Sequence, residues 1–269
     1  DVKARVVTLY GSLALTGKGH MTDVSLKEAS DPIPLQIIWD NTTKTDHPNT
    51  MDIVGFNENR LQLERVRVIS EGGGTWEAAG YDVNAHSKVY PHSTFNDIKR
   101  YIKENKMTLV DYVKKFDPEG YAYLPTVLKT LDASVQAGLN GSGFFDGPIH
   151  MSKMTKKILN NLKKRKFPKK SIYWAMAYGY SVGEINVQHG IVVTAPTLGS
   201  AGVFPSVLYW CRHHLGFKEE KLINMLAVGG IIGILFKKHG TVAGATGGCQ
   251  AECGCACAMA AAGYTWALK

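Results

Sequence analysis

Residues 124–139 read LPTVLKTLDASVQAGL, and their apolar side chains recur at intervals of three and four positions. In an α-helix of 3.6 residues per turn this spacing places them on one face, which needs a partner surface to bury it. We therefore predict a long amphipathic helix that ends at the glycines of residues 138–143. Its apolar face consists of Leu124, Val127, Leu128, Leu131, Val135 and Leu139.

Helical patterns also flank this segment. Asn96 is a candidate N-cap for a helix that carries Ile98, Tyr101 and Ile102, and Thr108 is the candidate N-cap of the next helix. Later patterns of the same kind cover residues 151–164, 171–188, 204–215, 219–237 and 250–268.

The first part of the chain has a different pattern. Short β-branched and apolar runs predict strands at Arg5–Tyr10, Leu35–Trp39 and Val66–Val68. The triple glycine at 72–74 predicts positive φ angles, in a loop or a hinge between two domains. We therefore predict an α+β fold, with an α+β N-terminal domain at residues 1–92 and an all-helical domain at residues 93–269.

Composition excludes several classes of protein. The chain has 269 residues, of which 45% are hydrophobic and 20% charged, as in ordinary soluble globular proteins. Nine of the basic residues behind its net charge of +8 lie in Lys153–Lys170. Phe167 is the single aromatic residue there that could stack on a base, so we expect a solvated surface and not a nucleic-acid site. The apolar run Leu222–Phe236 is too short for a membrane span and indicates a buried helix. No secretory signal pattern is present, and we expect a cytoplasmic protein.

Four of the five cysteines lie within nine residues, in the run GATGGCQAECGCACAMAAAG at 244–263. So dense a group of thiols predicts metal or iron–sulfur chemistry in a reducing compartment. If this segment is helical, Cys249, Cys253 and Cys257 share one face and Cys255 points elsewhere. The spacing matches neither a zinc finger nor a ferredoxin, and some of these thiols could equally be small core residues, as we expect for Cys211.

Three further segments contain candidate site residues. In YGSLALTGKGHMTD at 10–23, the glycines, Lys18 and His20 fit either a tight turn or an anion or substrate site. In DHPNTM at 46–51, His47 and Asn49 lie either in a plain surface loop or next to a substrate carboxylate.

The third segment, TAPTLGSAGVFP at 194–205, leads into a helix that we expect to begin near Pro205. Backbone N–H groups at a helix N-terminus, next to the hydroxyls of Thr197 and Ser200, would cradle a carboxylate. The alternative is that these small residues only allow two helices to pack closely.

Together these segments resemble the iron–sulfur-dependent bacterial L-serine dehydratases, also called L-serine ammonia-lyases. The match runs nearly from end to end and keeps five motifs in order. These are GSLALTGKGH at 11–20, HPNTM at 47–51, GGG at 72–74, APTLGSAG at 195–202 and GCQAE at 248–252.

The resemblance implies a cytoplasmic homo-oligomer that converts L-serine to pyruvate and ammonia without pyridoxal phosphate. It implies a [4Fe–4S] cluster held by three cysteines, whose open iron polarises the substrate's oxygens. By position, Cys249 corresponds to the first cluster ligand and His20, near Lys18, to the general base. His47 and Asn49 are then polar groups of the active site. Thr197, Gly199 and Ser200 would line the carboxylate cradle.

The chain departs from the family pattern at both ends. A Ser-Ser-His-Thr segment before the first strand is missing, and the family's other two cluster cysteines would lie beyond Lys269. We therefore expect a fragment, with Cys253 and Cys257 as candidates for surrogate ligands. Thr246 stands where an acidic residue is common. Two other hypotheses are a non-catalytic amino-acid-binding module of the same fold and a structural zinc site.

Overall fold

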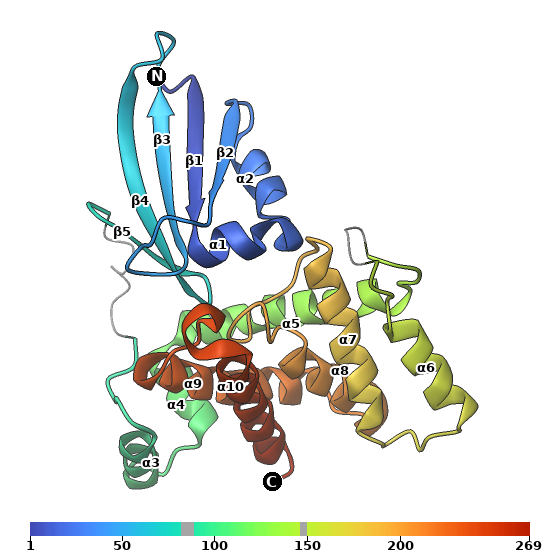
Figure 1. Cartoon of the computed structure of the whole chain (residues 1–269). Helices are drawn as coiled ribbons and strands as arrows, with labels where there is room; N and C mark the ends of the chain where they lie inside the picture. Colours follow the sequence, from blue (N-terminus) through green and yellow to red (C-terminus); the bar gives the residue numbers. More distant parts are fainter. Residues whose placement is uncertain (82–88, 146–149) are drawn as a thin grey trace. The chain divides into compact units, whose positions relative to one another are not determined.

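The computed structural model of the chain describes residues 1–81, 89–145 and 150–269 (Figure 1). It separates into two units, which are Asp1–His86 with Val187–His189, and Ser87–Asn186 with Gly190–Lys269. The described residues form a five-stranded sheet and ten α-helices, which confirms the mixed α+β class. The domain bounds 1–92 and 93–269 stay a prediction.

The five strands of the first unit form one sheet in the order β2-β1-β3-β4-β5. β1 and β2 run parallel, and every other neighbouring pair is antiparallel. The prediction found β1, β2 and β4 but missed β3, the central strand, and β5. The bounds are Ala4–Tyr10, Leu35–Asp40, Thr50–Phe56, Gln62–Gly72 and Thr75–Ala78 for β1 to β5.

The connection between β1 and β2 is helical. α1 (Gly11–Thr16), a 3₁₀ turn (Gly17–His20) and α2 (Thr22–Ser30) follow β1, as Figure 1 shows in blue. A parallel pair of strands needs such a crossover. The tight turn that we considered for residues 10–23 is present only at Gly17–His20, and helices lie on both sides of it. Gly17 is required by packing, because a Cβ there would lie 2.7 Å from the Trp39 ring.

The triple glycine forms the turn between β4 and β5. Gly72, Gly73 and Gly74 have φ angles of 86°, 60° and 82°, which confirms the predicted left-handed backbone. The hinge interpretation is wrong, because the turn joins two strands of one sheet.

The second unit is built from helices α3 to α10. Thr108 caps α4 in a capping box with Asp111, as predicted. α3 begins two residues earlier than predicted, because Thr94 and not Asn96 accepts the N–H of Asp97. The bounds are Phe95–Glu104, Leu109–Phe116, Pro118–Leu139, Thr155–Lys164, Tyr173–Val187, Val203–Leu215, Glu219–His239 and Gly244–Ala267 for α3 to α10.

The core of this unit gathers around α5, α8, α9 and α10. The predicted apolar face of α5 contributes Leu128, Leu131 and Val135, each at most 2% exposed. Cys211 is fully buried, which confirms its prediction as a core residue. α9 is a core helix, and no helix in the described part of the chain is both long and apolar enough to cross a membrane.

α9 and α10 pack with their backbones close together. A Cβ added at Gly263 of α10 would lie 2.7 Å from the carbonyl oxygen of Met225 in α9. At Gly254, in the same helix, a Cβ would meet nothing within 4 Å. The two glycines therefore have different roles: Gly263 permits packing, and Gly254 only makes the helix more flexible.

We predict that Gly263→Ala lowers the free energy of unfolding by about 1–3 kcal/mol, because the added methyl group overpacks the α9–α10 contact. The control Gly254→Ala should raise it by about 0.5–1 kcal/mol, through the higher helix propensity of alanine. Urea unfolding followed by circular dichroism measures both. Equal effects of the two substitutions would contradict this account of the packing.

Candidate functional site

The regular part of α10 begins at Cys249. Gly248, with φ 73° and ψ 171°, interrupts the helix that starts at Gly244. Cys249 therefore occupies the first turn of the long segment that follows. Backbone N–H groups in a first turn have no partner within the helix, so they are available to a sulfur ligand or an anion.

Cys249 and Cys253 lie on one face of α10, as predicted, with their Sγ atoms 3.8 Å apart. Cys249 is exposed and Cys253 is partly buried. Burial, followed by the neighbouring Cys249 sulfur, raises the pKa of the Cys253 thiol. Cys257 is exposed, whereas Cys255 points into the core, where burial raises its pKa to about 11. Cys255 is therefore a core residue.

Glu252 joins this helix to the segment that we expected to cradle a carboxylate. The Thr197 hydroxyl donates a 2.7 Å hydrogen bond to Oε1 of Glu252, and its oxygen lies 3.1 Å from the Ser200 hydroxyl. A Cβ at Gly199 or at Gly244 would come within 2.7 Å of the carboxylate. Two glycines thus leave room for the acid, and one threonine orients it.

The carboxylate held by Thr197 is therefore the chain's own. Thr197 and Ser200 are 3% and 1% exposed, and the Ser200 hydroxyl also donates to the carbonyl of Ala195 at 3.3 Å. A substrate carboxylate would have to compete with Glu252 for these hydroxyls. Sequence reasoning quoted Glu252 within a motif without giving it a role. Its position three residues after Cys249, and so on a neighbouring part of the helix surface, was the available signal.

We predict a favourable coupling of about 1.5–3 kcal/mol between Thr197 and Glu252, the value of a hydrogen bond to a charged group. It is measured as a double-mutant cycle with Thr197→Val and Glu252→Gln, by urea unfolding. As a control, Thr130→Val should be additive with Glu252→Gln, since the Thr130 hydroxyl donates within α5 to the carbonyl of Thr126. Additivity in both cycles would rule out the interaction as a structural link.

The predicted site residues of the first unit lie on two segments. Lys18 and His20 are exposed on the 3₁₀ turn, and the Lys18 amine lies 5.4 Å from the centre of the Trp39 ring. His47 and Asn49 lie just before β3, where Nδ1 of His47 accepts the backbone N–H of Asn49 at 3.1 Å. The neutral His47 ring therefore carries its proton on Nε2.

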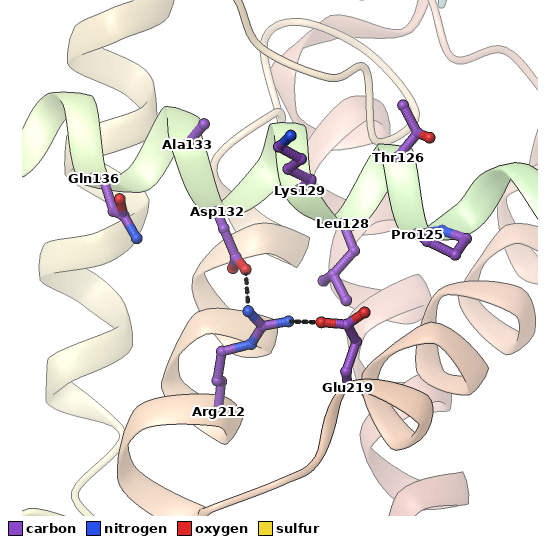
Figure 2. Close-up of a pocket in the computed structure, with 9 residues that line it drawn as sticks. All are labelled: Pro125, Thr126, Leu128, Lys129, Asp132, Ala133, Gln136, Arg212 and Glu219. Carbon is purple, nitrogen blue, oxygen red and sulfur yellow. Dashed lines mark ion pairs between the residues drawn. The ribbon is translucent and has the colours of Figure 1, made fainter.

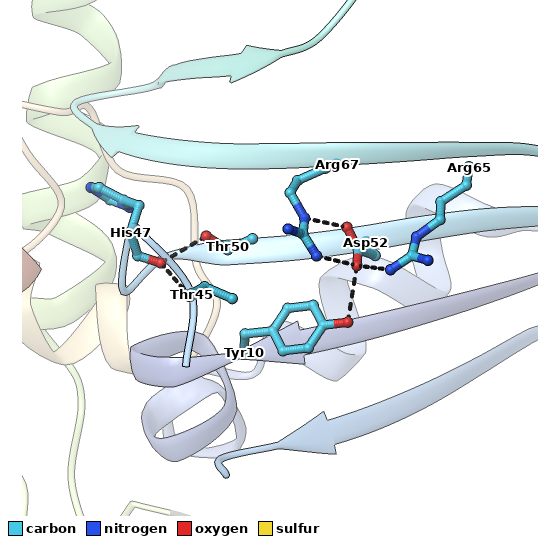
Figure 3. Close-up of polar contacts among 7 residues, drawn as sticks. All are labelled: Tyr10, Thr45, His47, Thr50, Asp52, Arg65 and Arg67. Atoms are coloured by element: carbon cyan, nitrogen blue, oxygen red, sulfur yellow. Dashed lines mark hydrogen bonds and ion pairs between the residues drawn. The ribbon is translucent and has the colours of Figure 1, made fainter. Parts of the chain in front are cut away.

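The backbone around His47 is held by hydroxyl groups. Its carbonyl accepts hydrogen bonds from Thr45 at 2.8 Å and from Thr50 at 2.7 Å, while the ring points away from the charged residues of the sheet (Figure 3). The Asn49 side chain donates to the carbonyl of Ser70 in β4 at 3.3 Å. Residues 47–49 are therefore part of a partly exposed loop, whose hydrogen bonds fix its entry into β3.

Asp52 in β3 is the buried acid of this sheet. Its side chain is 2% exposed and accepts two hydrogen bonds from Arg67, one from Arg65 and one from the Tyr10 hydroxyl (Figure 3). Hydrogen bonding to Arg67 is the largest cause that holds the pKa of Asp52 far below its usual value. Sequence reasoning missed this cluster because it missed β3.

We predict that Asp52→Asn lowers the free energy of unfolding by roughly 2 kcal/mol at pH 7, because it removes charge-assisted hydrogen bonds. Since the folded pKa is depressed, this contribution is complete above about pH 5 and is lost as the pH falls through the acid range. The difference in free energy of unfolding between the wild type and Asp52→Asn, measured by urea unfolding, should therefore become smaller below pH 4. The exposed Asp46→Asn is the control, and a constant difference at all pH values would contradict the assignment.

A cavity of about 560 Å³ lies between α5, α8 and α9 (Figure 2). Arg212 lines this cavity and forms ion pairs with Asp132 at 2.6 Å and with Glu219 at 3.7 Å. Burial raises the pKa of Asp132, and the charge of Arg212 opposes that shift. None of the predicted site residues lines this cavity, and its main charges already neutralise one another. We therefore do not place the candidate site there.

Comparison with known proteins identifies the family. The family model described as serine dehydratase alpha chain matches residues 56–269. The L-serine dehydratase of Mycobacterium bovis is 34% identical over 315 aligned residues, which cover 98% of this chain and 68% of that protein. The chain belongs to the serine dehydratase family. Its relatives include L-serine dehydratase of Haemophilus influenzae, at 28% identity over 96% of the chain and 68% of that protein, and L-serine dehydratase 1 of Escherichia coli, at 26% identity over the same shares.

The thiols of this serine dehydratase family member fit an iron–sulfur cluster only in part. Cys249 is exposed at a helix start and suits one ligand position. Two thiolates on a single tetrahedral ion with 2.3 Å bonds lie about 3.8 Å apart, whereas cluster cysteines bind separate irons. The spacing of Cys249 and Cys253 is thus that of one ion or of a direct contact. Over residues 1–81, 89–145 and 150–269, no three His, Cys, Asp or Glu side chains form a metal-binding group.

Proposed function

We propose that this chain is an L-serine ammonia-lyase that acts without pyridoxal phosphate. The reaction removes the α-proton and the β-hydroxyl of L-serine as water, and the resulting aminoacrylate hydrolyses to pyruvate and ammonia. The observation that carries the proposal is the family match over nearly the whole chain, together with Cys249 at the start of a helix beside Glu252. The chemistry points to cytoplasmic amino-acid catabolism, and we propose a homo-oligomer.

The cofactor in this proposal is a [4Fe–4S] cluster with Cys249 as one ligand. When bound, it supplies a Lewis acid that makes the serine hydroxyl a better leaving group. Cys249 suits this role because its thiol is exposed, unlike those of Cys211 and Cys255. The 3.8 Å contact argues against Cys253 as a second ligand of the same cluster, and Cys257 is the exposed thiol that stays a candidate.

Substrate recognition in this proposal centres on Glu252. The Glu252 carboxylate accepts a hydrogen bond from the Thr197 hydroxyl and has glycines on two sides. Its remaining oxygen surface can bind a cation, and the α-ammonium group of serine has the matching charge. Thr197 and Ser200 then act by orienting Glu252. Gly199 keeps the space open, since any side chain there would meet the acid.

His20 is the proposed base for the α-proton, with Lys18 next to it as a fixed positive charge. Both are exposed, as groups that meet a substrate must be. His47 and Asn49 are proposed to bind the substrate's polar groups. His47 suits this because Nδ1 is engaged by the backbone, which leaves Nε2–H as its donor.

The test is anaerobic reconstitution with ferrous iron and sulfide, followed by visible absorbance and by pyruvate release from L-serine. We expect Cys249→Ser to lose the iron–sulfur absorbance and at least a hundredfold of the activity, in line with loss of a residue on which the reaction depends. Cys211→Ala is the matched control at a buried thiol and should keep both. Undiminished turnover by Cys249→Ser would falsify the proposal.

An alternative function is a non-catalytic module that binds an amino acid. The hydrogen bond from Thr197 to Glu252 favours this alternative, because a carboxylate that is already oriented can bind an ammonium group without a metal. Calorimetry with L-serine separates the two functions. A colourless protein that binds L-serine, loses that binding in Glu252→Gln and releases no pyruvate after reconstitution would support the alternative.

A further inference from the structure

Cys249 and Cys253 are the two thiols of this chain that touch. Their Sγ atoms are 3.8 Å apart, one helical turn from each other. One is exposed and the other is partly buried, so a small molecule in solvent reaches Cys249 first. Cys211 and Cys255 are buried away from solvent, and Cys257 is exposed one turn further along α10.

We propose that Cys249 and Cys253 form a reversible thiol–disulfide site whose reaction partners are small-molecule disulfides. Cys249 is the attacking thiol and Cys253 is the resolving thiol. The exchange itself needs no metal, because it requires only two sulfurs in contact and an accessible first sulfur.

The local backbone permits the bond. In a helix, Cα atoms four residues apart are about 6 Å from each other, within the range of about 4.4–6.8 Å that disulfides span. The side chains must still move closer, which requires the first turn to shift. Gly248 leaves the helical conformation directly before Cys249. The helical backbone is therefore interrupted directly before the first turn, and the first N–H groups of a helical segment have no partner within it.

The chemistry balances without a metal. The thiolate of Cys249 attacks one sulfur of the small disulfide and expels the other as a thiolate, which leaves a mixed disulfide on Cys249. Cys253 then loses its proton to solvent, attacks the Cys249 sulfur and expels the second small thiolate. The two protein thiols have lost two electrons and two protons, and the small disulfide has gained them as two thiols.

The consequence for activity rests on the proposed function. A disulfide at Cys249 withholds that sulfur from a cluster, so oxidation and cluster assembly compete for the same atom. The disulfide would then protect the Cys249 thiol, and a dithiol reductant would return it to the free form that a cluster needs. The disulfide itself can be tested without iron or serine, so its failure and that of the proposed lyase are distinguishable.

The experiment treats the reduced, metal-free protein with oxidised glutathione. Of the five thiols in the chain, we expect two to be lost and to return with dithiothreitol, as counted in denaturant. Glutamyl endopeptidase cuts after Glu220 and Glu252, so the disulfide should join peptides 221–252 and 253–269. The first of these peptides contains Cys249 as its single cysteine, so the joined pair identifies it directly.

Two variants locate the partner of Cys249. Cys253→Ser should give no joined peptides and should instead accumulate glutathione on Cys249. The matched control Cys257→Ser removes the exposed thiol of the second peptide and should behave as the wild type. Both should unfold at the wild-type urea concentration before oxidation, which shows that the fold is kept.

Two results would overturn the proposal. The first is peptides that remain joined in Cys253→Ser, because the partner would then be another thiol. The second is a wild type that accumulates only the glutathione adduct and never the joined peptides, because the contact between the two sulfurs would then not lead to a bond.

Discussion

The close approach of α9 and α10 is the constraint on which the second unit depends. At Gly263 the two helices are so near that the Met225 carbonyl occupies the space of a side chain. One helical turn earlier in α10, Gly233 of α9 makes room for the Met259 sulfur, 2.9 Å from where a Cβ would lie. Cys249 and Glu252 belong to the same rigid helix as Gly263, so this packing also determines where they lie at the start of the regular part of α10.

Both units enclose a carboxylate, and each carboxylate is satisfied in a different way. Asp52 is surrounded by two guanidinium groups and a phenol, and the balance of charge holds it ionised inside a sheet. Glu252 has one hydroxyl donor and two glycines that make space for it. The first arrangement leaves little room for a ligand, whereas the second leaves part of a negative charge available. This difference is why we regard Glu252 as a functional residue and Asp52 as a structural one.

The accuracy of prediction varied with the range of the interactions involved. The N-cap at Thr108 depends on neighbouring residues alone, and it was predicted correctly. β3 was missed because Thr50–Phe56 contains Asp52 and Gly55, which weaken a strand signal that only pairing with β1 and β4 restores. In the segment before α2, the sequence left a tight turn and an anion site open for the glycines, and Trp39 in β2 explains why Gly17 is needed. For β3 and for Gly17, the deciding partner lies outside the local window.

The sequence by itself determined the helical face of residues 124–139, the common face of Cys249 and Cys253, and membership of a family through ordered motifs. These follow from periodicity and from residue identity, which are local properties. Only the tertiary structure decided that Glu252 meets Thr197, and that Cys255 enters the core. Such contacts depend on distances between segments far apart in sequence and on which face of a helix is covered, and packing alone sets these.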